Sequence, residues 1–336
     1  MQKNKSLDGF SAINKIRESK YSRWSYSDNS KNSLPDLAIN RIYKNIFVPN
    51  FRPKFKFDKN VKIFTIGSCF AREIESALIS LDVKVLSAIF LDRSNDIDLS
   101  EFNLKKHASE LLNRYSVPSM YQEILNLLSK GNFLSDKLLY KQSEGKYIEA
   151  HYTGLMGELP YEKLYEFRCK LTNALSARLI QSDVVILTLG LNEFWVDIKS
   201  SLVLNTIPSF PFLKANANDL KVCFGKPSEI NDLLAQTCLR LKEINPHIKI
   251  LITVSPVPLE YSFLADDVVI ENQAAKSVLY SAAIEMAFLY DFVDYFPSYE
   301  CVNFSEFSVA WKSDKRHVQQ EAVKSIMKLA ITSYFN

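Results

Sequence analysis

Three polar residues in two distant segments could together carry out acyl transfer. Ser68 directly follows Gly67 at the end of an apolar run, and Asp314 stands three residues before His317. A serine hydroxyl becomes a nucleophile only when a base takes its proton, and histidine is the side chain suited to that task near neutral pH. An aspartate that accepts the histidine Nδ1–H fixes the ring tautomer. These residue types predict a nucleophile at Ser68, a general base at His317 and an orienting carboxylate at Asp314.

A second group of polar and aromatic residues follows another apolar run. Gly190 would let the backbone approach Ser68 closely, because glycine has no side chain. Asn192 carries an amide that can donate a hydrogen bond to a developing oxyanion. Glu193 and Trp195 would contact a substrate. The alternatives are that Glu193 forms an ion pair at the surface and that Trp195 belongs to the core. We therefore expect this segment to supply oxyanion and substrate contacts.

These residues need a scaffold that brings distant segments to one place. Continuous apolar runs rich in β-branched residues predict strands that are buried on both faces, at 61–66, 184–189, 248–254 and 292–296, with a weaker edge strand at 83–86. Amphipathic stretches predict intervening helices at 71–80, 161–180 and 229–244. This alternation predicts an α/β fold with a parallel sheet and helices on both faces. Ligands of such sheets bind beyond the carboxyl ends of the strands, where the candidate residues stand.

Each candidate residue also has a purely structural interpretation. Ser68 could be only the N-cap of the following helix, and Asp314 and His317 could be a helix-start carboxylate and a surface histidine. Asn192 could cap a loop. Cys69 could itself be the nucleophile, although burial is the commoner fate of a free cysteine. The combination favours an esterase-like site, because separate segments supply nucleophile, oxyanion donor and base in an order that the fold can bring together.

The composition is that of an ordinary globular chain and excludes several classes of protein. Of the 336 residues, 47% are hydrophobic and 24% are charged, and the formal net charge is +3. This balance excludes disordered and collagen-like chains and gives no sign of a nucleic-acid partner. No apolar run is long enough for a transmembrane segment and no secretory signal is apparent. The five scattered cysteines fit reduced thiols, so a cytoplasmic location is expected.

No cofactor or metal is expected from the sequence. Neither a G-x-G-x-x-G pattern nor a Walker loop occurs, and the histidines and cysteines lack the spacing of metal ligands.

The chain is expected to form one domain with an extension and an insertion. Residues 1–58 are predicted to be a basic N-terminal extension packed on the core, since the first 60 residues hold 13 Lys/Arg against 5 Asp/Glu. Their charge marks either a solvated surface or a contact for an anionic polymer or membrane. Residues 59–336 would form the main domain, with an insertion at about 92–160. A helix is expected within it at 119–129, with Ser119 as its N-cap.

The same segments resemble a known family. The pentapeptide at 67–71, Gly-Ser-Cys-Phe-Ala, resembles the signature for which the GSCFA family is named. Further similar segments are found, in order, at 113–115, 188–195, 255–259, 295–300 and 314–318. The resemblance extends from about residue 45 to the C-terminus. It implies a grouping with the SGNH (GDSL-like) hydrolases, and so a three-layer, flavodoxin-like α/β/α sandwich with a Ser-His-Asp site.

The resemblance also implies individual roles. Ser68 matches the nucleophile, His317 the general base and later general acid, and Asp314 its partner. Gly190 and Asn192 match the block that supplies glycine and asparagine in SGNH enzymes.

A further glycine of those enzymes has no counterpart here, because residues 72–130 contain none. Asn113 or Arg114 is expected to occupy its space beside the oxyanion.

The sequence therefore predicts a serine esterase-type acyl transfer on O-acyl, in particular O-acetyl, groups of a carbohydrate or surface polysaccharide. One alternative is a polysaccharide O-acetyltransferase that uses the same site with a separate acyl donor. A second alternative is a non-catalytic glycan-binding or scaffold protein of polysaccharide biosynthesis.

Overall fold

A sheet of five parallel strands forms the centre of the molecule. The computed structural model describes residues 6–19, 21–89, 102, 108–130, 133–134, 136–205 and 207–336. The sheet order is β2-β1-β5-β8-β9, and every neighbouring pair is parallel. The bounds are β1 Lys62–Gly67, β2 Lys84–Val85, β5 Val184–Leu189, β8 Lys249–Val254 and β9 Val293–Tyr295. Counted within the sheet, this is the flavodoxin-like order 2-1-3-4-5. The predicted α/β fold is confirmed, including the short edge strand.

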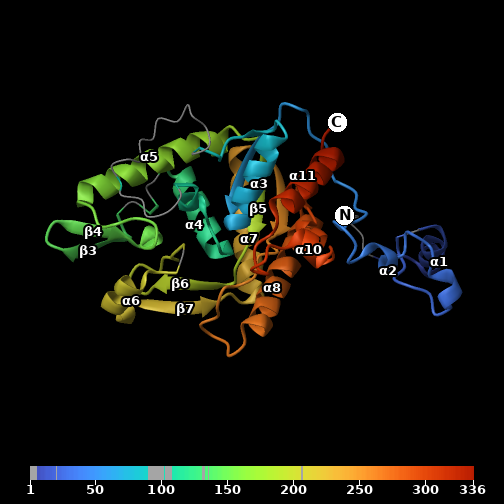
Figure 1. The fold of residues 1–336 in the computed structure, drawn as a ribbon. Helices are drawn as coiled ribbons and strands as arrows, with labels where there is room; N and C mark the ends of the chain where they lie inside the picture. The colour runs from blue at the N-terminus through green and yellow to red at the C-terminus, as the bar shows by residue number, and fades with distance from the viewer. Residues whose placement is uncertain are drawn as a thin grey trace.

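Helices cover both faces of this sheet (Figure 1). Their bounds are α1 Gly9–Glu18, α2 Ala38–Arg41, α3 Cys69–Ser80, α4 Val117–Leu128, α5 Tyr161–Ile180, α6 Phe210–Asn216, α7 Pro227–Ile244, α8 Val268–Leu289, α9 Ser298–Asn303, α10 Phe307–Ala310 and α11 Gln320–Tyr334. On one face α3 packs against α11, and on the other α5, α4, α7 and α8 pack in that order. Among the described helices, none combines the length and hydropathy needed to cross a bilayer.

Successive strand residues point to opposite helical layers. In β5, Val185 and Leu187 belong to the core cluster that contains residues of α4, α5, α7 and α8. Val184 and Ile186 belong to the cluster that contains residues of α3 and α11. This period of two follows from the pleat of a strand. Because both faces are covered, all six residues of β5 are buried, which explains the continuous apolar run.

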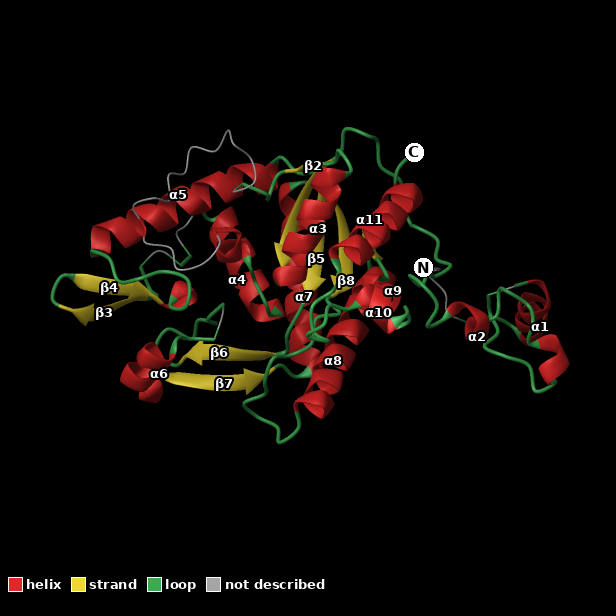
Figure 2. Cartoon of the chain, in the orientation of Figure 1, coloured by secondary structure: helices red, strands yellow, loops and turns green. Residues whose placement is uncertain are grey.

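Two antiparallel pairs, which the sequence patterns did not predict, extend from one side of the core (Figures 1 and 2). The pair β3 (Leu139–Ser143) and β4 (Lys146–Glu149) forms a hairpin. The pair β6 (Glu193–Asp197) and β7 (Leu220–Phe224) forms a ribbon, in which Trp195 lies opposite Val222. Only three residues separate the end of β5 from the start of the ribbon, so it continues directly from the main sheet toward the candidate site.

Part of the predicted insertion belongs to the core. Helix α4 packs between α5 and α7 in the helical layer. Its N-cap is Ser116 rather than Ser119: the Ser116 hydroxyl accepts the backbone N–H of Ser119 at 3.3 Å, which puts Ser119 at the third helical position. The helix therefore begins two residues before the predicted start, and Pro118 fits its first turn. Within the predicted insertion, residues 92–101, 103–107, 131–132 and 135 lie outside the described part of the chain.

The N-terminal extension contacts the core through its second half. The Lys54 amino group donates to the carbonyls of Tyr290 at 3.1 Å and Val293 at 2.9 Å. An aromatic cluster surrounds Tyr334, made by Phe51, Phe55, Phe57 and Phe296. By contrast, α1 has no buried residue, and α1 and α2 lie on the side away from the β3–β4 hairpin (Figure 1).

Candidate active site

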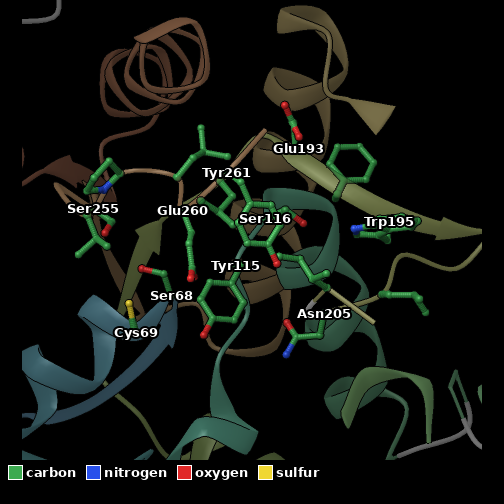
Figure 3. A pocket seen from close by; sticks show the side chains of 18 of the residues that line it. Ser68, Cys69, Tyr115, Ser116, Glu193, Trp195, Asn205, Ser255, Glu260 and Tyr261 are labelled. Atoms are coloured by element: carbon green, nitrogen blue, oxygen red, sulfur yellow. The ribbon is translucent and has the colours of Figure 1, made fainter. Parts of the chain in front are cut away.

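A cavity of about 300 Å³ lies beyond the carboxyl ends of β1, β5 and β8. This is the end of the sheet at which a parallel α/β fold binds its ligands. Ser68 and Cys69 after β1, Gly190 after β5 and Ser255 after β8 all line it. Figure 3 shows Ser68, Cys69 and Ser255 on one side of the cavity and Trp195 on the other.

Ser68 occupies the N-cap position of α3, yet its hydroxyl does not cap the helix. The residue is 3% exposed, and its Oγ has no hydrogen-bond partner among the described residues. In a capping serine, that oxygen accepts a hydrogen bond from a backbone N–H group of the first turn. Here the hydroxyl stays available at the cavity, beside the positive end of the α3 dipole. The arrangement suits a nucleophile better than a structural cap.

Two glycines allow the chain to come this close. A Cβ on Gly67 would lie 2.5 Å from the carbonyl oxygen of Thr188 on the neighbouring strand. A Cβ on Gly190 would lie 2.8 Å from the Ser68 Cβ and 2.9 Å from the carbonyl oxygen of Tyr115. All three distances are far below van der Waals contact, so a side chain at either position would displace its neighbours. Gly190 therefore packs directly against Ser68.

Asp314 and His317 form the expected pair. The ring Nδ1 of His317 lies 2.7 Å from Asp314 Oδ2, and the backbone N–H groups of Arg316 and His317 each donate to Asp314 Oδ1 at 2.9 Å. These hydrogen bonds hold the pKa of the Asp314 carboxyl well below its usual range, and the bond from the backbone N–H of His317 contributes most. The cavity lining includes Arg316 but not His317, and no hydrogen bond joins His317 to Ser68 in the described chain. The pair is formed, but it stands at the edge of the cavity.

Cys69 is the competing nucleophile, and its surroundings disfavour it. The thiol is half-buried at the cavity, and burial raises its pKa. A thiol is reactive as the thiolate, so a raised pKa lowers the reactive fraction at neutral pH.

The residues after Gly190 divide between the wall and the interior. Asn192 is fully buried and donates its amide Nδ2 to the carbonyl of Gly225 at 2.8 Å. It is absent from the cavity lining, so the structure does not bring this amide to the expected oxyanion position. Glu193 and Trp195 do line the cavity. The indole Nε1 of Trp195 has no hydrogen-bond partner among the described residues.

Glu193 also fixes a loop that covers the cavity. Its carboxylate accepts the Ser262 hydroxyl and the backbone N–H of Phe263, the latter at 2.9 Å. The Phe263 ring meets Trp195 edge to face, with 5.1 Å between centroids. Tyr261 and Phe263 of this loop line the cavity as well.

The segment 113–115 reaches the site through a different residue than expected. Arg114 points into the core, where its guanidinium bonds Glu123 at 2.8 Å, and it takes no part in the lining. Tyr115 lines the cavity, and Asn113 supports it by donating Nδ2 to the Tyr115 hydroxyl at 3.0 Å. The segment is extended and bridges to Gly67, so alternate side chains face opposite sides. That alternation is the signal by which Tyr115, rather than Arg114, could have been placed at the cavity.

One charged residue at the site carries no sequence motif. Lys276 lies buried in α8, and its Nζ donates to the carbonyls of Gly190 at 2.7 Å and Val257 at 2.8 Å. The clue would have been a lysine on the apolar face of a helix at 268–289, a helix that the sequence patterns did not predict. No set of three or more His, Cys, Asp or Glu side chains that could hold a metal occurs within the described ranges.

Comparison with known proteins identifies a family and distant structural neighbours. The family model described as the GSCFA family matches residues 62–329. A search of curated proteins gave no match. Among solved structures, a Clostridium thermocellum family 3 carbohydrate esterase is similar over 81% of this chain and 94% of its own, at 11% identity and a TM-score of 0.33. So distant a likeness carries no information about activity.

Proposed function

Because the chain belongs to the GSCFA family, we propose that it is a serine esterase-type enzyme that transfers acyl groups through Ser68. The observation that carries the proposal is the Ser68 hydroxyl itself. It is buried at a cavity, at a helix N-terminus and against Gly190, and has no hydrogen-bond partner among the described residues. A buried hydroxyl without a partner is unfavourable for stability, and such groups are concentrated at functional sites.

In the first half-reaction, Ser68 Oγ attacks the carbonyl carbon of the ester. His317 takes the hydroxyl proton and then gives it to the departing alcohol oxygen, while Asp314 stabilises the imidazolium. In the second half, water loses a proton to His317 and attacks the acyl-enzyme, which releases the carboxylic acid and restores Ser68. His317 must approach Ser68 when substrate binds, a tightening that is common in catalytic hydrogen bonds.

Backbone N–H groups are the best candidates to donate hydrogen bonds to the oxyanion. Ser68 lies at the N-terminus of α3, and its N–H makes only a long bond of 3.4 Å to the Thr188 carbonyl, so this N–H is the donor proposed for the oxyanion. Asn192, whose amide already bonds Gly225, is not assigned this role.

The proposed substrate is an O-acyl group, in particular O-acetyl, on a carbohydrate or surface polysaccharide. Trp195 and Tyr261 on the cavity wall support a substrate with a flat apolar face and hydroxyl groups, since an indole ring can stack on it and donate one hydrogen bond. An O-acetyltransferase would use the same residues with a sugar hydroxyl in place of water.

The test compares turnover of p-nitrophenyl acetate by the wild type, Ser68→Ala and His317→Ala. Each substitution is expected to lower turnover on the order of 10⁴–10⁶-fold. A fluorophosphonate probe, mapped by mass spectrometry, should label Ser68. A folded wild type with neither turnover nor label would contradict the proposal and favour a glycan-binding protein. Product analysis with an acetylated sugar, with and without a second sugar as acceptor, separates hydrolysis from transfer.

A further inference from the structure

Lys276 is a buried lysine that the proposed chemistry leaves unused. It stands on the inward face of α8 with Ala275, Leu279 and Ala283, and it is 2% exposed. Burying an amine away from water is unfavourable unless its hydrogens are well bonded. Within the described part of the chain, no carboxylate forms an ion pair with it, and its two hydrogen bonds go to backbone carbonyls. A residue so unfavourable for the fold calls for a role.

The amino group joins two walls of the cavity from behind. Gly190 follows β5 and Val257 lies in the loop after β8, and these two strands are neighbours in the sheet. Both residues line the cavity. Two N–H groups are enough for both carbonyls, so the contact forms with a neutral amine as well as with an ammonium group.

The bond to Gly190 sets the direction of one peptide group. The Gly190 carbonyl points toward Lys276, which does not line the cavity, while the N–H of the same peptide, on Leu191, donates to the Tyr115 carbonyl at 2.7 Å. Glycine permits other backbone conformations. Because the C=O and N–H of a peptide point in opposite directions, a rotated peptide would turn its carbonyl oxygen toward the Tyr115 carbonyl. Tyr115 O and the Ser68 side chain both lie close to Gly190, so the rotated oxygen would come nearer to Ser68. A carbonyl dipole so directed would repel an oxyanion.

We propose that Lys276 is a positioning residue for acyl transfer at Ser68, which keeps the Gly190 carbonyl turned away from the developing oxyanion. The inference rests on the proposed function and adds to it a residue that touches neither substrate nor reacting atoms. Lys276 acts through Gly190, so its removal should slow bond formation at Ser68 more than it weakens binding.

The test is the kinetics of fluorophosphonate labelling. In that reaction the Ser68 Oγ–phosphorus bond forms, fluoride leaves, the hydroxyl proton goes to the base, and a phosphonyl oxygen takes the place of the oxyanion. The variants are Lys276→Met and, as a matched control, Lys54→Met. Lys54 also donates to carbonyls near the end of α8, at Tyr290 and Val293, far along the helix from the cavity. Thermal unfolding is measured on each protein.

Lys276→Met is expected to lower the maximal labelling rate about 100-fold, as loss of an oxyanion contact does, with the half-saturating probe concentration within about threefold of wild type. Lys54→Met should melt at a lower temperature but label at the wild-type rate. Any of three results would overturn the inference. They are an equal fall of the maximal labelling rate in both variants, a wild-type rate in Lys276→Met, and a change in the half-saturating probe concentration alone.

Two further outcomes are distinguishable. If Lys276→Met does not fold, Lys276→Ala replaces it, because alanine likewise cannot donate to the Gly190 and Val257 carbonyls, and an unchanged labelling rate in that variant overturns the inference. If the wild type itself is not labelled, the proposed function fails and takes this inference with it.

Discussion

At the scale of single residues, the neighbours Ser68 and Cys69 differ in what surrounds them. Both line the cavity at the start of α3. The serine oxygen has no partner among the described residues, whereas burial raises the pKa of the thiol. Position alone does not separate two nucleophiles one residue apart. The local hydrogen bonding and solvation do, and they favour the serine.

Cys69→Ala is therefore expected to keep turnover of p-nitrophenyl acetate within about threefold of wild type, because a protonated thiol contributes little to the attack. Ser68→Ala is the matched neighbour and should be inactive. Iodoacetamide treatment of the wild type gives an independent check. Complete loss of activity in Cys69→Ala, with the protein folded, would reverse the assignment of the nucleophile.

Asn192→Ala is expected to affect stability more than turnover. The substitution leaves the buried Gly225 carbonyl without its amide donor, which costs about 1–3 kcal/mol of unfolding free energy. Turnover should stay within about tenfold of wild type, whereas loss of an oxyanion donor costs about 10²–10³-fold. Asn245→Ala, which removes a similar amide bond to the Ser182 carbonyl, is the control. A turnover loss above that range at unchanged stability would restore the oxyanion role.

At the scale of elements, the β6–β7 ribbon and the loop at 260–264 form one wall of the cavity. Glu193 joins them, since it begins β6 and accepts hydrogen bonds from Ser262 and Phe263. The wall thus depends on a carboxylate used as a double acceptor rather than as an acid or base.

Glu193→Ala should free this loop and raise KM about tenfold, while kcat changes by less than about threefold, because the change affects binding in ground and transition states alike. Glu193→Gln is the control. Its amide oxygen can accept the Phe263 N–H, so KM should remain near the wild-type value. An equal fall of kcat and kcat/KM in Glu193→Ala would instead indicate a part in the chemical step.

The burial of Lys276 in α8 should make the free energy of unfolding depend on pH. Burial lowers the pKa of Lys276 to about 7, against an ordinary value near 10.5. Below pH 7 the amine is protonated in folded and unfolded chains alike, and the buried charge destabilises the folded state. Above pH 7 the unfolded chain binds more protons, so the stability of the wild type rises with pH relative to Lys276→Met. Urea unfolding of both proteins at pH 6 and pH 9 measures this. A pH-independent difference would contradict it.

At the scale of the whole molecule, the sequence was most informative where burial is complete. The runs 61–66, 184–189 and 248–254 are apolar on both faces because helices cover both sides of the sheet. The β3–β4 and β6–β7 pairs are partly exposed, and their short mixed patterns gave no clear period.

The site was predictable only in part, for a related reason. Ser68, Gly190, Asp314 and His317 lie within motifs, and the structure puts the first two and the last two in contact. Which of Asn113, Arg114 and Tyr115 faces the cavity depends on the pairing of an extended segment with β1, which residue types do not reveal. Lys276 is set by tertiary contacts alone.

The N-terminal extension should tolerate removal of its first part but not of its second. Deleting residues 1–42 removes α1 and α2, which bury no residue of their own, and the buried Leu37, which belongs to none of the three core clusters of the described chain, so the melting temperature should shift by only about 2 °C. Deleting residues 1–58 also removes Lys54 and three of the rings around Tyr334. Losing one buried ring costs about 3–5 kcal/mol, so this variant should be severely destabilised. Thermal unfolding, with Ser68 labelling as a check, decides. Equal melting temperatures would contradict the packing.

The aromatic cluster has a consequence for synthesis on the ribosome. Phe51, Phe55 and Phe57 emerge from the ribosome well before Tyr334, the ring that they surround, because about 280 residues separate them from it in the sequence. A nascent chain must carry these aromatic side chains without their partner until α11 has been made. They are therefore exposed for the period in which chaperones bind the polypeptide, and release from the chaperones should follow completion of α11.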